Sequence, residues 1–240
     1  MANNNLVLIC GSSATGKSAS LMGLENPEGV MYLNTEANKR LPFPSKFKEF
    51  NITDPLQVVE AFEHAETKPD IHTVVVDSQT FLMDQYESTY VLGSANTMAA
   101  WGDYAQFFKT LMQQTVASST KNVYFTAHTK TTYNEGDMVL ETKVPVKGSL
   151  QGNGIEAYFS VVIACKRMTI KQLEGYKSPL LNISEEEMED GFKYVFQTRL
   201  TKDTVNERIR APLKMFSRQE TFIDNNVEHL TKRLHEYYGN

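Results

Sequence analysis

A short run near the start of the chain has the residue types and spacing of a phosphate-binding loop. The run is Gly11-Ser12-Ser13-Ala14-Thr15-Gly16-Lys17-Ser18, followed by Ala19. In the pattern G-x-x-x-x-G-K-[ST], glycines let backbone N–H groups close around a phosphate, the lysine reaches the β- and γ-phosphates, and the hydroxyl ligates Mg²⁺. Residues 11–19 are therefore predicted to bind ATP, with Lys17 on the phosphates and Ser18 on Mg²⁺. The alternative is a glycine- and serine-rich turn that matches by chance.

Two carboxylates follow apolar runs further along the chain. Asp77 closes the run at residues 71–76, which has a Walker B pattern, and would hold Mg²⁺ together with Ser18. Glu36 comes just after the run at residues 30–34 and would orient or deprotonate the water that attacks the γ-phosphate. The alternatives are an aspartate that caps the next turn and a glutamate in a solvated loop.

A third apolar run ends at a histidine and leads into a glycine-containing stretch. His128 would lie beside the γ-phosphate and report its hydrolysis to the following segment, although a structural or solvated histidine is the alternative. The stretch at residues 129–154 carries Lys130, Lys143 and Lys147, which suit a nucleic-acid phosphate backbone. Acidic residues in the same stretch favour the alternative of a solvated hairpin.

These side chains need a scaffold that brings the ends of several strands to one edge. Buried strands are predicted from the apolar runs at residues 6–10, 30–34, 71–76, 122–127 and 157–164. Helical spacing between most of them indicates an α/β fold, with a mainly parallel central sheet flanked by helices and a C-terminal β-hairpin region. Residues 1–240 are predicted to form one domain, in which residues 165–192 are a peripheral insert.

Composition narrows the class of protein. The 240 residues are 41% hydrophobic and 22% charged, with a net charge of −5, which excludes a globally basic coat protein for nucleic acid but not a local basic groove. Cys10 and Cys165 each end an apolar run and are predicted to be buried thiols in a reducing cytoplasm. No apolar stretch is long enough to span a membrane, so a soluble, intracellular protein without a membrane partner is expected.

The order of these motifs resembles the RecA-like P-loop ATPase core. After the P-loop, the strand that ends at Glu36 matches the family's catalytic carboxylate, and Val-Val-Val-Asp-Ser at residues 74–78 is similar to its Walker B strand. His128 occupies the place of the γ-phosphate sensor, which is usually glutamine in that family. The loop after it corresponds to the second DNA-binding loop, and its end at residues 152–160, Gly-Asn-Gly-Ile-Glu-Ala-Tyr-Phe-Ser, is similar to a RecA run.

A late basic segment extends the resemblance. Arg208-Ile209-Arg210-Ala211-Pro212 is similar to the segment that reaches a neighbour's nucleotide in RecA filaments. The resemblance implies Arg208 as a finger acting in trans, with Arg210 and Lys202 as further candidates, and hence a homo-oligomeric ring or filament. In its small size and minimal core, the chain is most similar to phage single-strand-annealing ATPases of the Sak-four type. That family implies single-stranded DNA binding, strand annealing and homologous recombination in the cytoplasm of a phage-infected bacterium, beside a single-strand-binding protein.

Three other functions fit the same motifs. One is a helicase-like or other partner-regulated P-loop ATPase, and another is a nucleotide-dependent kinase. The third is an assembly module that is switched by nucleotide and has negligible turnover.

Overall fold

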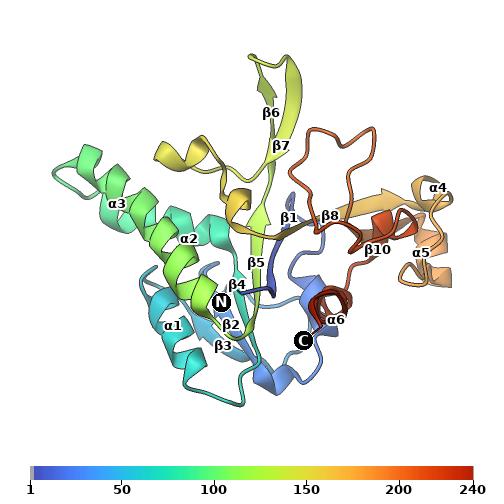
Figure 1. Cartoon of the computed structure of the whole chain (residues 1–240), viewed down its shortest axis with the longest axis horizontal. Helices are drawn as coiled ribbons and strands as arrows, with labels where there is room; N and C mark the ends of the chain where they lie inside the picture. Colours follow the sequence, from blue (N-terminus) through green and yellow to red (C-terminus); the bar gives the residue numbers. More distant parts are fainter. Residues whose placement is uncertain (1–2, 240) are drawn as a thin grey trace.

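A computed structural model describes residues 3–239, which form a central eight-stranded sheet with helices on both faces and a separate two-stranded hairpin (Figure 1). The sheet strands are β1 (Leu6–Gly11), β2 (Val30–Asn34), β3 (Lys48–Asn51), β4 (Thr73–Asp77), β5 (Asn122–His128), β8 (Val161–Thr169), β9 (Phe192–Gln197) and β10 (Phe222–Asp224). Their order is β10-β9-β8-β1-β5-β4-β2-β3. Pairing is parallel from β8 to β3 and antiparallel at β9 and β10, which confirms the mainly parallel sheet with an antiparallel C-terminal region.

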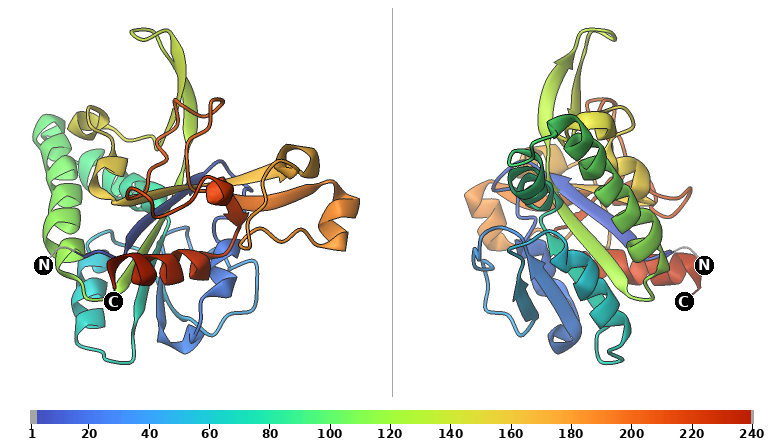
Figure 2. Two further views of the ribbon diagram at one scale, coloured as in Figure 1. Left: turned by 45° about the vertical axis from the view of Figure 1, so that its right-hand side comes forward. Right: turned by 90° about the vertical axis from the view of Figure 1, so that its left-hand side faces the viewer.

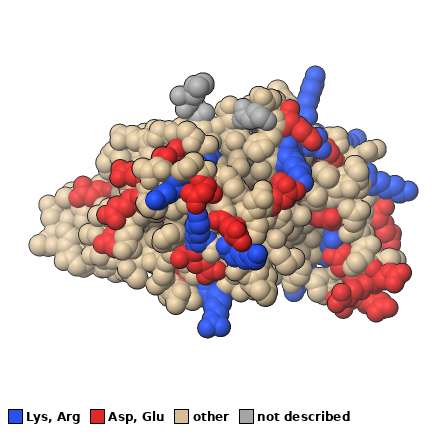
Figure 3. Space-filling model, turned by 90° about the horizontal axis from the view of Figure 1, so that it is seen from below, with Lys and Arg blue, Asp and Glu red and all other residues tan. Residues whose placement is uncertain are grey.

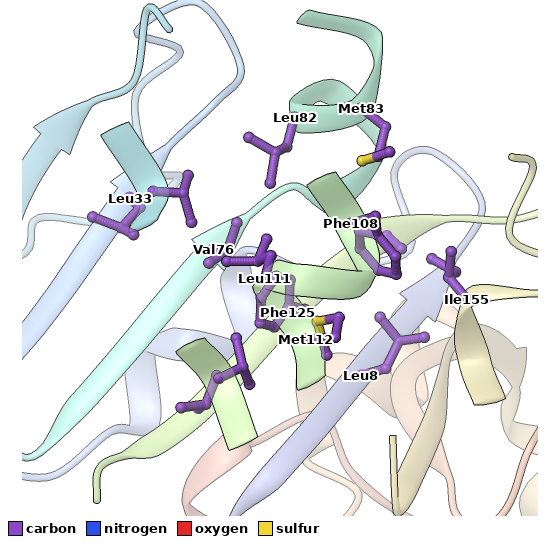
Figure 4. Close-up of a cluster of buried hydrophobic side chains, with 14 of the residues drawn as sticks. Leu8, Leu33, Val76, Leu82, Met83, Phe108, Leu111, Met112, Phe125 and Ile155 are labelled. Carbon is purple, nitrogen blue, oxygen red and sulfur yellow. The ribbon is translucent and has the colours of Figure 1, made fainter. Parts of the chain in front are cut away.

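The central strands β1, β2 and β4 are buried throughout and nearly all apolar, because both faces of the sheet are covered there, whereas the edge strand β3 is polar and largely exposed. Along β1, Leu8 faces one core while Val7 and Ile9 face the other, as the two-residue period of a strand requires. The first core lies beneath α1 (Gln57–Glu66), α2 (Gln79–Tyr86) and α3 (Thr97–Thr110), where Phe108 packs over the sheet (Figure 4). The second core lies beneath α6 (Val227–Tyr238), which covers the opposite face (Figure 2).

Helical structure near the sheet is more varied than the sequence suggested. The segment after the P-loop is a 3-10 helix at Ala19–Gly23, and further 3-10 turns occupy Pro27–Gly29, Gly148–Gln151, Ile155–Tyr158 and Gln219–Thr221. Single π-helical turns extend α2 and α3, at Glu87–Val91 and Leu111–Val116. Asn226 caps α6 by accepting from the N–H of Glu228, and left-handed Gly239 ends the helix.

The connection between β8 and β9 corrects the expected insert at residues 165–192. Lys166 pairs with Val195 and Thr169 with Phe192, so both ends of this segment belong to the sheet. Only the part that contains α4 (Ile170–Leu173) and α5 (Glu185–Asp190) is peripheral. The acidic first turn of α5 is stabilised by a capping box from Ser184.

The stretch after His128 folds into a hairpin of β6 (Lys130–Asn134) and β7 (Val139–Lys143), which projects from the body of the molecule (Figures 1 and 2). On the face opposite the hairpin, acidic and basic side chains are interspersed, and acidic ones gather on the side of α5 (Figure 3). Within residues 3–239, every helix is too short or too polar to cross a lipid bilayer.

Candidate active site

The P-loop leaves β1 with the backbone geometry of an anion nest. Ala14 and Gly16, on either side of Thr15, have positive φ angles of 58° and 90°, which turn successive N–H groups towards one space. Among residues 3–239, no group accepts a hydrogen bond from the backbone N–H groups of residues 13–18. A Cβ on Gly16 would lie 2.6 Å from the Asn225 side chain, so the tight turn requires glycine there. This row of unpaired donors fits a polyphosphate.

The C-terminal part of the chain holds the loop in place. Asn225 Nδ2 donates to the Gly16 carbonyl at 2.9 Å, and the Cys165 thiol lies 2.9 Å from the Thr15 carbonyl and 3.2 Å from Asn225 Oδ1. Burial raises the pKa of Cys165 to about 12, so its thiol remains a donor. Cys10 and Cys165 are both free and buried, as predicted. Nothing in the sequence near Asn225 signals this role.

Lys17, Ser18 and Asp77 meet at the carboxyl edge of the sheet. Lys17 Nζ donates to the carbonyls of Gly11 and Ser12 at 3.0 and 2.8 Å, and burial lowers its pKa. Ser18 Oγ donates to Asp77 Oδ2 at 2.7 Å. A hydroxyl and a carboxylate this close are the oxygen donors that Mg²⁺ prefers, so these residues fit the predicted metal.

Two further hydroxyls orient the Asp77 carboxylate. Tyr32 donates to Oδ2 at 2.7 Å, and Thr126 donates to Oδ1. Burial and the neighbouring carboxylate raise the pKa of Tyr32, so its hydroxyl stays protonated. Both partners come from neighbouring strands, β2 and β5, and sequence spacing gives no sign of them.

Glu36 follows β2 and lies against two basic side chains. Its Oε1 is 3.6 Å from His128 Nε2, at the end of β5, and its Oε2 accepts from Lys39 Nζ at 2.8 Å. His128 and Lys39 lower the pKa of Glu36 to about 2, although its partial burial acts in the opposite direction. The carboxylate is therefore ionised at neutral pH. The His128 ring makes an edge contact with Phe81, and the backbone N–H of His128 donates to Thr80 Oγ1.

These groups line one cavity of about 340 Å³, within the size range of small-ligand sites. Its walls are Ser13–Ala19 together with Tyr32, Glu36, Lys39, Arg40, Pro42, Asp77, His128 and Tyr194. The structure thus brings together five side chains that were predicted from four separate motifs: Lys17, Ser18, Glu36, Asp77 and His128. Tyr194 and Arg40 were not predicted, because neither belongs to a local pattern.

The other predicted cations lie outside this cavity. Arg208 borders a second cleft, of about 410 Å³, on the far side of the P-loop, where it pairs with Glu141 of β7. Arg210 donates to the carbonyls of Glu156, Ala157 and Phe159, so it stabilises its own chain, which weighs against a role in trans. Lys202 is exposed.

The three lysines proposed for DNA binding are only partly grouped. Lys130 and Lys143 are paired residues across the hairpin. Lys143 also contacts Glu141 at 2.8 Å, and Lys147, beyond the hairpin, pairs with Glu87. Part of the expected positive charge is therefore neutralised within the chain.

Fold and site together define a P-loop nucleoside triphosphatase in which β5 lies between the P-loop strand and the Walker B strand. The chain belongs to the AAA domain family, because the family model described as AAA domain matches residues 3–204. No curated protein matches the chain significantly. The family match confirms the expected class of P-loop ATPase.

Proposed function

We propose that this protein is a Mg²⁺-dependent ATPase that acts on single-stranded DNA and promotes strand annealing during homologous recombination in a phage-infected bacterial cytoplasm. One observation carries the DNA part of this proposal. Strand β5 runs from between the two nucleotide-binding strands, past His128, directly into the projecting hairpin. The parts of the proposal that concern strand annealing and a phage context rest on the resemblance of the sequence to Sak-four-type proteins.

Hydrolysis follows from the roles of four side chains. Lys17 and the P-loop N–H groups would bind the phosphates, and Ser18 and Asp77 would hold Mg²⁺, which would supply positive charge to offset that of the phosphates. The water oxygen forms a bond to the γ-phosphorus. At the same time the bond from the γ-phosphorus to the bridging oxygen breaks, and its electron pair stays on ADP. With a pKa of about 2, Glu36 is suited to orient this water, whose proton passes to the released phosphate.

The hairpin is joined directly to the P-loop. The N–H of Thr129 donates to the Gly11 carbonyl at 3.1 Å, and Lys17 Nζ donates to the same oxygen. Lys130 follows at the base of β6, and Tyr133, whose side chain is exposed, could stack on a base. A change at the phosphates therefore has a short path to the proposed DNA contact, through the hydrogen bond between Gly11 and Thr129.

The test is the ATPase rate with and without single-stranded DNA at two salt concentrations. We expect stimulation that weakens as salt rises, because phosphate contacts release counterions. Lys17→Ala should abolish turnover and leave the fold intact, and the double variant Lys130→Ala/Lys143→Ala should retain basal turnover but lose stimulation. Absence of stimulation by any single-stranded nucleic acid would contradict the DNA proposal, and phosphate transfer to an acceptor instead of release would favour a kinase.

A second candidate is an ATPase regulated by a protein partner, such as a single-strand-binding protein. It is favoured by the exposed apolar side chains Tyr133, Met138 and Leu140 on the hairpin, which are 56%, 76% and 62% accessible. Stimulation by such a protein without DNA, lost in Leu140→Ser, would support this candidate over the first.

We also propose that the active form is a homo-oligomer in which Arg208 reaches a neighbour's nucleotide. This requires release of its ion pair with Glu141. Mixing Lys17→Ala protein with Arg208→Ala protein should restore part of the activity, because each intact site would combine residues of two chains. A fully active monomer in sedimentation would contradict the proposal.

A further inference from the structure

The turn after Glu36 has an uncommon backbone. Ala37 and Asn38 have φ angles of 51° and 63°, two consecutive left-handed residues without glycine. Such conformations are costly for residues with a Cβ and persist where surrounding contacts enforce them, often at functional sites. Here the buried Asn34 enforces them, because its Oδ1 accepts from the Glu36 N–H at 2.9 Å and its Nδ2 donates to the Lys39 carbonyl at 2.8 Å.

This turn folds the chain back so that Lys39 lies over the carboxylate of Glu36. The Lys39 side chain is 68% exposed, whereas that of Glu36 is only 9% exposed. Lys39 therefore contributes little to packing, and its ammonium can move on a flexible stem. Both residues line the cavity that contains the P-loop, which Lys17 and Asp77 also line, and His128 on β5 lies beside Glu36.

We propose that Lys39 senses the substrate, by exchanging the Glu36 carboxylate for the terminal phosphate of a nucleoside triphosphate. This inference rests on the proposed function of the cavity. A terminal phosphate carries more negative charge than one carboxylate, so it competes effectively for the ammonium. A nucleoside diphosphate, whose last phosphate is bound by the P-loop and Lys17, leaves the Lys39–Glu36 pair in place.

The exchange has a consequence for the attacking water. In the paired arrangement His128 lies against Oε1 and Lys39 occupies Oε2, so a water must compete with the ammonium for the carboxylate. When Lys39 moves to the phosphate, Oε2 is released and only His128 remains as a basic neighbour. Because Lys39 is one of the two groups that lower the pKa of Glu36, its departure also makes this carboxylate a stronger acceptor for the water.

The test compares the affinities for ATP and ADP, measured by equilibrium titration of the full-length protein with fluorescent analogues of each. Lys39→Met removes the charge while keeping a stem of similar length, and Lys39→Arg keeps the charge. Lys46→Met is the matched control, because Lys46 is 74% exposed and pairs with Glu28 outside the cavity. Thermal midpoints of all variants report whether each one is folded.

We expect Lys39→Met to weaken ATP binding about tenfold, because the complex loses a charge-assisted bond to the terminal phosphate. ADP binding should change less than about twofold, because with ADP the substitution removes only the exposed ion pair between Lys39 and Glu36. Lys39→Arg should recover most of the preference for ATP, and Lys46→Met should match the wild type. Equal weakening of ATP and ADP, no change in either, or no recovery in Lys39→Arg would overturn the exchange.

The proposal that the protein hydrolyses ATP can be tested separately from the proposed role of Lys39. If the wild type binds ATP but releases no phosphate, the ATP-to-ADP affinity ratio still decides the role of Lys39. If Lys17→Ala binds both nucleotides as tightly as the wild type, the cavity is not the nucleotide-binding site, and the proposed role of Lys39 falls with it.

Discussion

Replacing Asn225 by alanine should weaken ATP binding from outside the nucleotide cavity. The amide donates to the Gly16 carbonyl at 2.9 Å and accepts from the Cys165 thiol at 3.2 Å, and these bonds fix the turn that precedes Lys17. A neutral hydrogen bond contributes about 1 kcal/mol and the thiol contact less, so Asn225→Ala should lower the free energy of unfolding by about 1–1.5 kcal/mol. If that stabilisation serves to hold the loop ready for phosphate, ATP affinity should fall by up to about tenfold.

A second substitution separates loop geometry from general stability. Asn225→Asp keeps the acceptor for Cys165 but places a carboxylate against the Gly16 carbonyl and near the phosphates, so ATP affinity should fall further than in Asn225→Ala. The assays are urea unfolding and nucleotide titration, with Gln106→Ala as a control, because the exposed amide of Gln106 only bonds Thr110. The role of Asn225 in positioning the loop would be refuted if Asn225→Ala lost the expected stability, about 1–1.5 kcal/mol, but kept the ATP affinity of the wild type.

The remaining predictions concern Glu36 and the two arginines. Glu36→Gln should lower kcat about 10²-fold or more while ATP binding is retained, measured as phosphate release, since the charge that orients the water is removed. Because folding depresses the pKa of Glu36 from 4.5 to about 2, its stabilising contribution is present above about pH 5 and is lost as pH falls towards 2, so wild type and Glu36→Gln should converge in acid unfolding curves. Arg210→Ala should lower the free energy of unfolding by about 1–2 kcal/mol, because partly buried carbonyls lose their donor, whereas Arg208→Ala should cost less than about 1 kcal/mol in urea unfolding.

The P-loop, Asp77, Glu36 and His128 could be placed from the sequence because each stands at or just after the end of an apolar run that forms a buried strand. Once such strands are known to be parallel, their ends must share one edge, and the cavity follows. The helix α2 was not predicted, since its polar surface hides a weak apolar pattern. The hairpin was weighed only as an alternative, because its strands are largely exposed.

Other parts of the site had no local signal. Asn225 lies more than two hundred positions from the loop that it holds, and Tyr194 reaches the cavity only because β9 is added to the sheet beside β8. Lys39 is an ordinary basic residue in the sequence, and its importance depends on the left-handed turn that brings it back onto Glu36. Contacts of this kind are fixed by tertiary packing and not by spacing along the chain.

The hairpin also has the geometry of a lever arm. Its base is tied to the P-loop at Gly11, while its strands β6 and β7, each five residues long, extend away from the body. At about 3.3 Å per residue this arm is about 16 Å long, so a tilt of about 10° at the base would carry the tip about 3 Å. A small rearrangement around the phosphates would thus be amplified at the tip into a displacement of about one residue's rise along a strand.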